Sequence, residues 1–150
     1  MKTSTPKILK LDEQQLVEQF FESTQLIGIV SDLPDYQLCW HLNQDLNMDF
    51  RVNHDLEIAW KQNRRTYYFT LFEYLDTRLL NLHYLYNNHK QGIALLPEVK
   101  HLNYIWLIKG TNFTTNDRED LLITLKQLPY IRMAVVLFQE ELKNRCNLIL

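Results

Sequence analysis

The chain has 150 residues, enough for one domain with its own hydrophobic core. Its apolar fraction of 46% excludes a disordered chain, and its net charge of −2 excludes a global field that attracts DNA or an anionic membrane. The first residues lack the apolar core of a signal peptide, and no apolar stretch approaches the roughly 20 residues that span a bilayer. We therefore expect one soluble, cytoplasmic domain over residues 1–150, with residues 1–7 loose.

Residue types that often build active sites are sparse and dispersed. The three glycines form no phosphate-binding loop, and the five histidines show no metal-ligand spacing. Cys39 and Cys146 form no C-x-x-C pair and lie among apolar residues, which favours reduced, buried thiols. The sequence thus predicts no metal and no cofactor.

The N-terminal third predicts two helices around one strand. Residues 8–22 fit a helix, although residues 8–11 also fit an edge strand. Residues 25–30 are apolar and β-branched, which predicts a strand that ends in a turn. Asp35 is then placed to cap a helix over residues 36–46. Four apolar residues at helical spacing form its expected buried stripe: Leu38, Cys39, Leu42 and Leu46.

From residue 50 to 86 the apolar period changes to two, which predicts an antiparallel meander. Its strands are expected at residues 50–52, 56–60, 66–74 and 79–86, joined by short polar turns. Aromatic residues on both faces of 66–74 predict a central strand. Strand 79–86 has one apolar face and one mixed face. We expect the mixed face, with Asn81 and His83, to be exposed to solvent or functional.

Strands follow at residues 92–96 and 104–109, on either side of Pro97, a residue confined to strand ends and edges. Asn116 and Glu119 have capping-box spacing for a helix.

Pro129 ends that helix, and a last strand is expected over residues 131–138. Trp40 and Trp106 are expected in the core. The apolar residues 148–150 either pack on the core or dock another molecule. This order of elements predicts an α+β domain with a largely antiparallel or mixed sheet and helices packed mainly on one face.

The segment LPEVKHLNY at residues 96–104 resembles the signature of the IPExxxVDY family, small bacterial proteins of the Bacteroidetes type. Pro97, Glu98 and Tyr104 stand at the Pro, Glu and Tyr of the motif, whereas Asn103 replaces its Asp. Further similarity lies at residues 26–29, 35–43, 108–110 and 147–149. The resemblance implies a family named for its motif, and no particular activity. If the acid is catalytic in relatives, this chain lacks it.

Glu98 is the most conspicuous carboxylate, because the stiff Pro97 holds it at a strand end. It either binds a ligand or accepts hydrogen bonds from turn amides. The candidate binding residues are Glu98 and five others: Pro97, Tyr104, Asp35, Tyr36 and His83.

Residues 61–69 mix basic and aromatic residues, as in proteins that bind single-stranded RNA. The candidate nucleic-acid residues are Lys61, Arg64, Arg65 and Tyr67. A hairpin turn with solvated charges beside a core strand explains the same pattern.

The sequence favours a non-catalytic protein-interaction or adaptor module, whose partner is another protein or a second copy of the chain. Its expected surface is the mixed face or the Pro97 and Glu98 corner. The alternative is an RNA- or ribosome-associated protein. A third possibility is an enzyme whose site combines Asp35, Tyr36, Glu98 and Tyr104, and it requires these groups to converge in a pocket.

Overall fold

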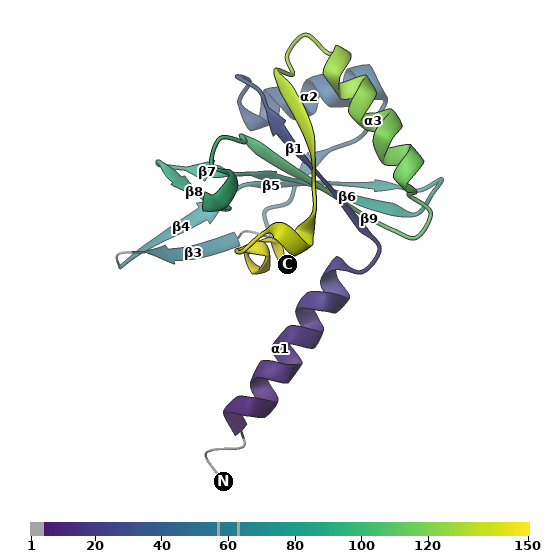
Figure 1. The fold of residues 1–150 in the computed structure, drawn as a ribbon. Coiled ribbons are helices and arrows are strands. Elements are labelled where there is room, and N and C mark those ends of the chain that lie inside the picture. Colours follow the sequence, from purple (N-terminus) through teal and green to yellow (C-terminus); the bar gives the residue numbers. More distant parts are fainter. Residues whose placement is uncertain (1–4, 57, 63) are drawn as a thin grey trace.

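The computed structural model describes residues 5–56, 58–62 and 64–150, which are organised by a six-stranded sheet (Figure 1). In spatial order its strands are β10 (Met133–Leu137), β1 (Thr24–Val30), β9 (Tyr104–Lys109), β6 (Asn81–Asn87), β5 (Leu71–Asp76) and β2 (Arg51–Val52). Neighbouring strands all pair antiparallel, so the alternative of a mixed sheet is not realised. The α+β class is confirmed.

Smaller elements surround this sheet. The helices are α1 (Thr5–Phe21), α2 (Asp35–Leu46) and α3 (Thr115–Gln127). Two separate hairpins pair β3 (Ile58–Gln62) with β4 (Arg65–Phe69), and β7 (His89–Lys90) with β8 (Ile93–Ala94). Short 3-10 turns are η1 (Pro97–Val99), η2 (Gln139–Glu141) and η3 (Arg145–Leu148).

One face of the sheet is covered by α2 and α3, as the sequence predicts. The buried stripes of these helices, Leu38, Cys39 and Leu42 from α2 and Leu122 and Leu125 from α3, pack in a single cluster with β1 and β9. Trp106 of β9 lies fully buried at its centre, among Ile27, Phe50 and Leu85. We call this side the helix face.

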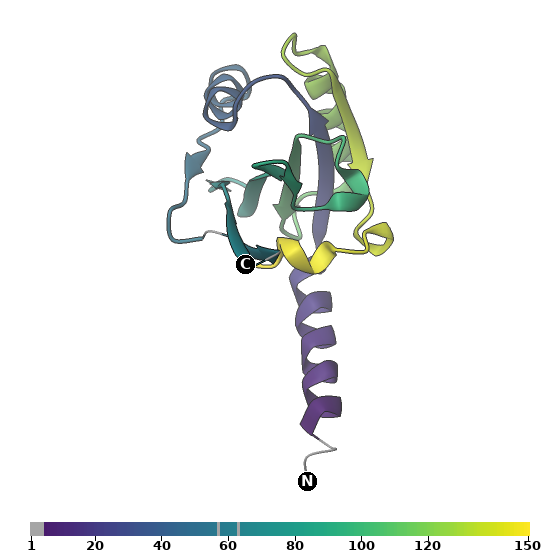
Figure 2. The same ribbon diagram turned by 90° about the vertical axis from the view of Figure 1, so that its left-hand side faces the viewer.

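The opposite side, which we call the turn face, is covered by turns and a hairpin. Leu95, Leu96 and Leu148 are fully buried there, with Phe69 of β4 and Leu142. The apolar C-terminal segment therefore packs on the core through Leu148, one of the two expected alternatives. Figures 1 and 2 show α1 extending away from both faces, and its C-terminal part joins this cluster through the buried Phe21 and the partly buried Val17 and Phe20.

The prediction of one central strand over residues 66–74 is wrong, because these residues form two strands that belong to two different sheets. β4 ends at Phe69 and β5 begins at Leu71, with Thr70 between them. Phe69 folds onto the turn face within the hairpin, whereas Phe72 packs on the helix face. β5 itself lies next to the edge strand β2, so the aromatic residues on both faces reflect two cores and not a central position.

The mixed face of β6 is not a surface. Asn81 is fully buried and His83 is 3% exposed, because the cluster under α2 and α3 covers that face. Leu79 and Leu80, expected in the strand, belong to an exposed turn before it.

The helix ends also differ in detail from the sequence prediction. Thr114 caps α3 and forms a capping box with Asp117, two residues before the predicted pair Asn116 and Glu119. Pro34, not Asp35, is the N-cap of α2, while the Asp35 carboxylate accepts a hydrogen bond from Tyr36 N at 2.7 Å.

Three smaller expectations need correction. α1 begins at Thr5, inside the segment expected to be loose, and residues 1–4 lie outside the described part. The strand expected at 92–96 is limited to β8. Cys39 is buried as expected, but Cys146 is exposed, and both are free thiols. None of the described helices is long and apolar enough to cross a membrane.

Candidate functional site

The Glu98 carboxylate is engaged within the fold. Pro97 opens the turn η1, and Glu98 accepts hydrogen bonds from Asn144 N at 2.6 Å and from Asn144 Nδ2 at 3.2 Å. Burial alone raises the pKa of Glu98, but the hydrogen bonds outweigh it and the pKa lies below its ordinary value. Glu98 therefore ties η1 to the C-terminal segment. Of the two roles expected for it, this is the acceptance of hydrogen bonds within the fold.

Asn88 organises the same segment, although the sequence analysis did not single it out. Its buried Nδ2 donates to Val99 O at 3.1 Å and Leu102 O at 2.9 Å, and its Oδ1 accepts from Leu96 N at 2.8 Å. One side chain thus satisfies three backbone groups in the loop from β8 to β9. An asparagine at a strand end carries no sequence signal for this role.

Asn103 and Tyr104 connect the motif to the turn before α2. Asn103 Oδ1 accepts from Ser31 N at 2.9 Å, and Tyr104 OH donates to Leu33 O at 2.5 Å. Burial raises the pKa of Tyr104, so the phenol stays protonated. The motif residues therefore connect separate parts of the fold.

The structure does not assemble the candidate enzyme site. Glu98 bonds to Asn144 on the side of the turn face, whereas Tyr104 packs in the cluster of the helix face. Asp35 does lie near Tyr104 and accepts a bond from Asn87 Nδ2 at 3.4 Å, but Tyr36 points to solvent. In the described ranges, no group of three His, Cys, Asp or Glu side chains is placed to hold a metal ion.

His83 is a core residue. Its Nδ1 accepts a hydrogen bond from Trp106 Nε1 at 3.0 Å. Burial lowers the pKa of His83 to about 4, so the imidazole is neutral at pH 7. Its burial leaves it almost no surface in this fold, so its binding role stays a prediction that the structure does not support.

The outer side of α2 carries two large aromatic side chains in solvent. Tyr36 is 63% exposed and Trp40 is 60% exposed, and four residues apart they share one face of the helix. The ring of Trp40 is edge-on to that of His41, with 5.0 Å between the ring centroids, and 4.8 Å separates the ring centroids of His41 and Tyr130. We call these four residues the α2 aromatic surface. The expectation that Trp40 is buried is wrong.

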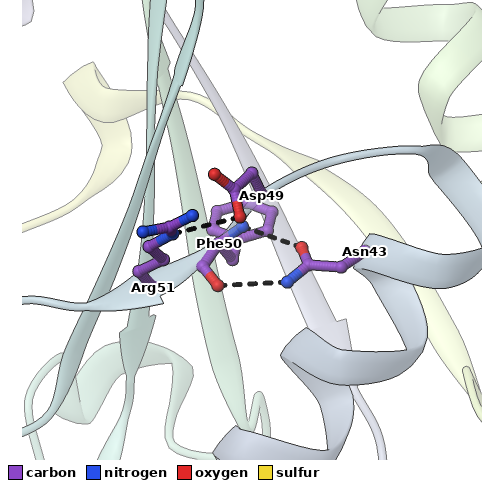
Figure 3. A network of polar contacts seen from close by, with 4 residues as sticks. All are labelled: Asn43, Asp49, Phe50 and Arg51. Carbon is purple, nitrogen blue, oxygen red and sulfur yellow. Dashed lines mark hydrogen bonds and ion pairs between the residues drawn. The ribbon is translucent and has the colours of Figure 1, made fainter.

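This surface rests on a firmly held helix. Asn43 Oδ1 accepts from Phe50 N at 2.8 Å and Asn43 Nδ2 donates to Phe50 O at 3.1 Å, which ties α2 to the start of β2 (Figure 3). Tyr130 OH donates to Asp45 Oδ2 at 2.8 Å near the end of the helix. The aromatic groups are therefore presented by a support with few ways to move.

The helix that carries this surface is acidic. α2 contains no lysine or arginine, and it carries Asp35 in its first turn and Asp45 in its last. Carboxylates beside exposed aromatic rings favour a cationic group, because the ring faces attract positive charge as well.

A second candidate is the β3–β4 hairpin. Lys61, Arg64 and Arg65 are exposed as predicted, but Tyr67 is half-buried and packs toward the turn face. Tyr68, on the other side of β4, is exposed instead and shares its face with Lys61.

Tyr68 also lines a hollow of about 200 Å³ with His54 and Lys90. Basic groups and an exposed aromatic side chain, Tyr68, thus lie together on this hairpin.

No protein-family model matches the chain, and no curated protein matches it. The IPExxxVDY resemblance stays a prediction that rests on residues 96–104 and on the further similarity at residues 26–29, 35–43, 108–110 and 147–149. Asp35 and Tyr36 were among the predicted site residues, whereas Trp40 and Tyr130 were missed. A helical projection could have found Trp40, because it lies on the side of α2 opposite Leu38 and Leu42.

Proposed function

We propose that this chain is a non-catalytic protein-interaction module whose partner binds the α2 aromatic surface. The observation that carries the proposal is the exposure of Tyr36 and Trp40 side by side on one helix. Tryptophan and tyrosine are the residues that most often dominate binding energy at protein interfaces, and a rigid support lowers the entropy lost on binding. A cytoplasmic location and IPExxxVDY membership belong to the same proposal.

The partner that fits is a protein segment with an arginine or lysine between apolar residues. Such a side chain would stack on Trp40 or Tyr36, and its charge would be attracted by Asp35 at one end of α2 or by Asp45 at the other. Binding should then weaken with salt, and Asp35→Asn combined with Asp45→Asn should lower affinity.

The test compares tagged baits recovered from native cells with and without nuclease. The wild type is set beside Tyr36→Ala/Trp40→Ala and beside Ile123→Ala, which removes a similarly exposed apolar side chain from α3. We expect a nuclease-resistant protein partner that is lost with the double variant and kept with Ile123→Ala. With the purified partner, the double variant should raise Kd at least about tenfold. A partner that binds the double variant as tightly as the wild type contradicts the proposal.

RNA binding is the second candidate, supported by exposed basic groups beside Tyr68 on the hairpin. The same experiment with Arg64→Ala/Arg65→Ala addresses it. If this bait alone loses its partners, and nuclease removes them from the wild type, the RNA function replaces the first proposal. RNA affinity should also fall steeply as salt rises, because the contacts are to phosphates.

A further inference from the structure

A hollow of about 470 Å³ lies between the end of α1 and the C-terminal turns η2 and η3. Its volume falls within the range of roughly 300–1,000 Å³ that is typical of sites for small molecules. Glu18, Phe21 and Glu22 line it on one side, and Gln139 and Arg145 line it on the other. Figure 2 shows these turns beside the end of α1. The hollow is separate from the α2 aromatic surface, so its role does not depend on the partner that binds there.

Arg145 is the positive group of this hollow, and the fold holds it in position. Its Nη1 donates a hydrogen bond to Gln139 Oε1, and its guanidinium lies over the ring of Phe21, 5.7 Å from the ring centroid. A guanidinium has five N–H groups, so these contacts leave donors for a further acceptor. A fixed arginine with free donors fits a carboxylate, which can accept two parallel hydrogen bonds.

The opposite wall of the hollow is negative. Glu18 and Glu22 are exposed and lie four residues apart, so they face the same side. The last turn of α1 has no basic residue, and the carbonyl end of a helix adds partial negative charge. Lys109 lies close enough to Glu22 to interact with it, but its Nζ donates to Phe20 O and it does not line the hollow. This wall therefore favours an ammonium group.

We propose that the hollow binds a small zwitterion, a free amino acid or a dipeptide, with its carboxylate at Arg145 and its ammonium at Glu18 and Glu22. Among the residues that the structure describes, no ion pair includes any of these three side chains. The opposite charges thus line one hollow without pairing, and a ligand that carries both charges can contact both walls. Phe21 adds an apolar wall, and the amide of Gln19 can bond to a peptide group.

The ligand class is tested by isothermal titration calorimetry of the full chain with L-leucine and with leucyl-leucine. We expect a Kd of about 1 mM or lower for at least one of them, and the tighter of the two distinguishes amino acids from peptides. The N-acetylated form of that probe lacks the ammonium, and its C-terminal amide lacks the carboxylate. Each should bind at least about tenfold more weakly. The proposal is overturned if neither probe binds at about 10 mM, or if either modified form binds as tightly as its parent.

Charge-removing variants test the position of the site. Glu18→Gln/Glu22→Gln should raise the Kd at least about tenfold. The matched control Asp12→Asn/Glu13→Gln removes two exposed charges from the same helix, outside the hollow, and should leave the Kd unchanged. An acidic-wall variant that binds as tightly as this control overturns the proposal.

Arg145→Gln removes the positive group and should also raise the Kd at least about tenfold. Circular dichroism melting reports whether this variant is folded, because Arg145 also packs on Phe21. A folded Arg145→Gln with unchanged affinity overturns the proposal. If Arg145→Gln does not fold, the exposed Glu18 and Glu22 decide the outcome, since their replacement removes no packing contact from the core.

Discussion

The two faces of the six-stranded sheet are covered by different kinds of structure. On the helix face, α2 and α3 bury apolar stripes, and the contact is distributed over many side chains. On the turn face, short turns and a hairpin lie over the strands, and individual polar side chains hold them in place. Asn88 binds the loop before β9, and Glu98 binds the C-terminal segment.

The turn face has two further links of the same kind. Tyr86 OH donates to Leu148 O at 2.7 Å, and Asn147 Nδ2 donates to Leu95 O at 2.8 Å. A helix tolerates the loss of one contact because its own backbone bonds remain, whereas an irregular loop depends on each side chain that satisfies its backbone. Single polar substitutions should therefore have their largest effects on the turn face.

Asn88→Ala should produce the largest effect. It leaves Leu96 N and Leu102 O without a partner, whereas Val99 O keeps its bond from Leu102 N, and each buried unsatisfied group costs about 1–3 kcal/mol. We expect a loss of about 4 kcal/mol in the free energy of unfolding, measured by urea denaturation. The control Asn112→Ala removes an exposed bond to Leu79 O and should cost under about 0.5 kcal/mol. If the two variants lose equal free energy of unfolding, single polar side chains do not hold the turn face in place.

The helix face should respond to acid through His83. Burial holds the pKa of His83 at about 4, below its ordinary 6.5, so the unfolded chain binds the proton first as pH falls. The stability that depends on neutral His83 is complete above pH 6.5 and is lost as pH falls toward 4. The loss should amount to about 3 kcal/mol, at 1.36 kcal/mol for each pKa unit.

The measurement is urea denaturation at several pH values for the wild type and His83→Gln. Glutamine retains an acceptor for Trp106 but does not titrate in this range. The variant should be less stable at pH 7 and should show a flatter dependence on pH. If both proteins lose stability in parallel between pH 6.5 and 4, His83 is not the group responsible.

Glu98→Gln should give the smallest of the three effects. Glutamine keeps an oxygen for Asn144 N but loses the charge that strengthens the bond, so we expect a cost of about 1 kcal/mol. The pKa of Glu98 lies below its ordinary value, so its contribution is complete above that value and is lost as pH falls through the folded pKa. Glu141→Gln, on an exposed residue of the neighbouring turn, is the control and should change little. No difference between the two variants would contradict a structural role for Glu98.

The helix face was predictable from the sequence for a physical reason. Apolar residues at helical spacing, such as Leu38 and Leu42 or Leu122 and Leu125, lie on one side of any helix they form. The turn face was not predictable, because its contacts join residues far apart, as Asn144 and Glu98 do. No local pattern encodes such a link.

The candidate sites were predictable only in part. The basic residues of the hairpin were found because charge at a turn stays in solvent. Tyr67 and Tyr68 were not distinguished, since only the folded hairpin shows which of them faces the core. Trp40 was wrongly expected in the core, because the prediction relied on its large apolar side chain. Its position on α2, opposite the buried stripe, was not taken into account.

The position of β1 has a consequence for how the chain folds. β1 is flanked by β9 and β10, so its partners begin at Tyr104 and Met133, far along the chain from Thr24–Val30. During synthesis its apolar residues leave the ribosome long before either neighbour exists. Contacts between such distant residues close large loops, which slows folding to milliseconds or longer. β1 is thus an apolar segment that stays unpaired until most of the chain has been synthesised.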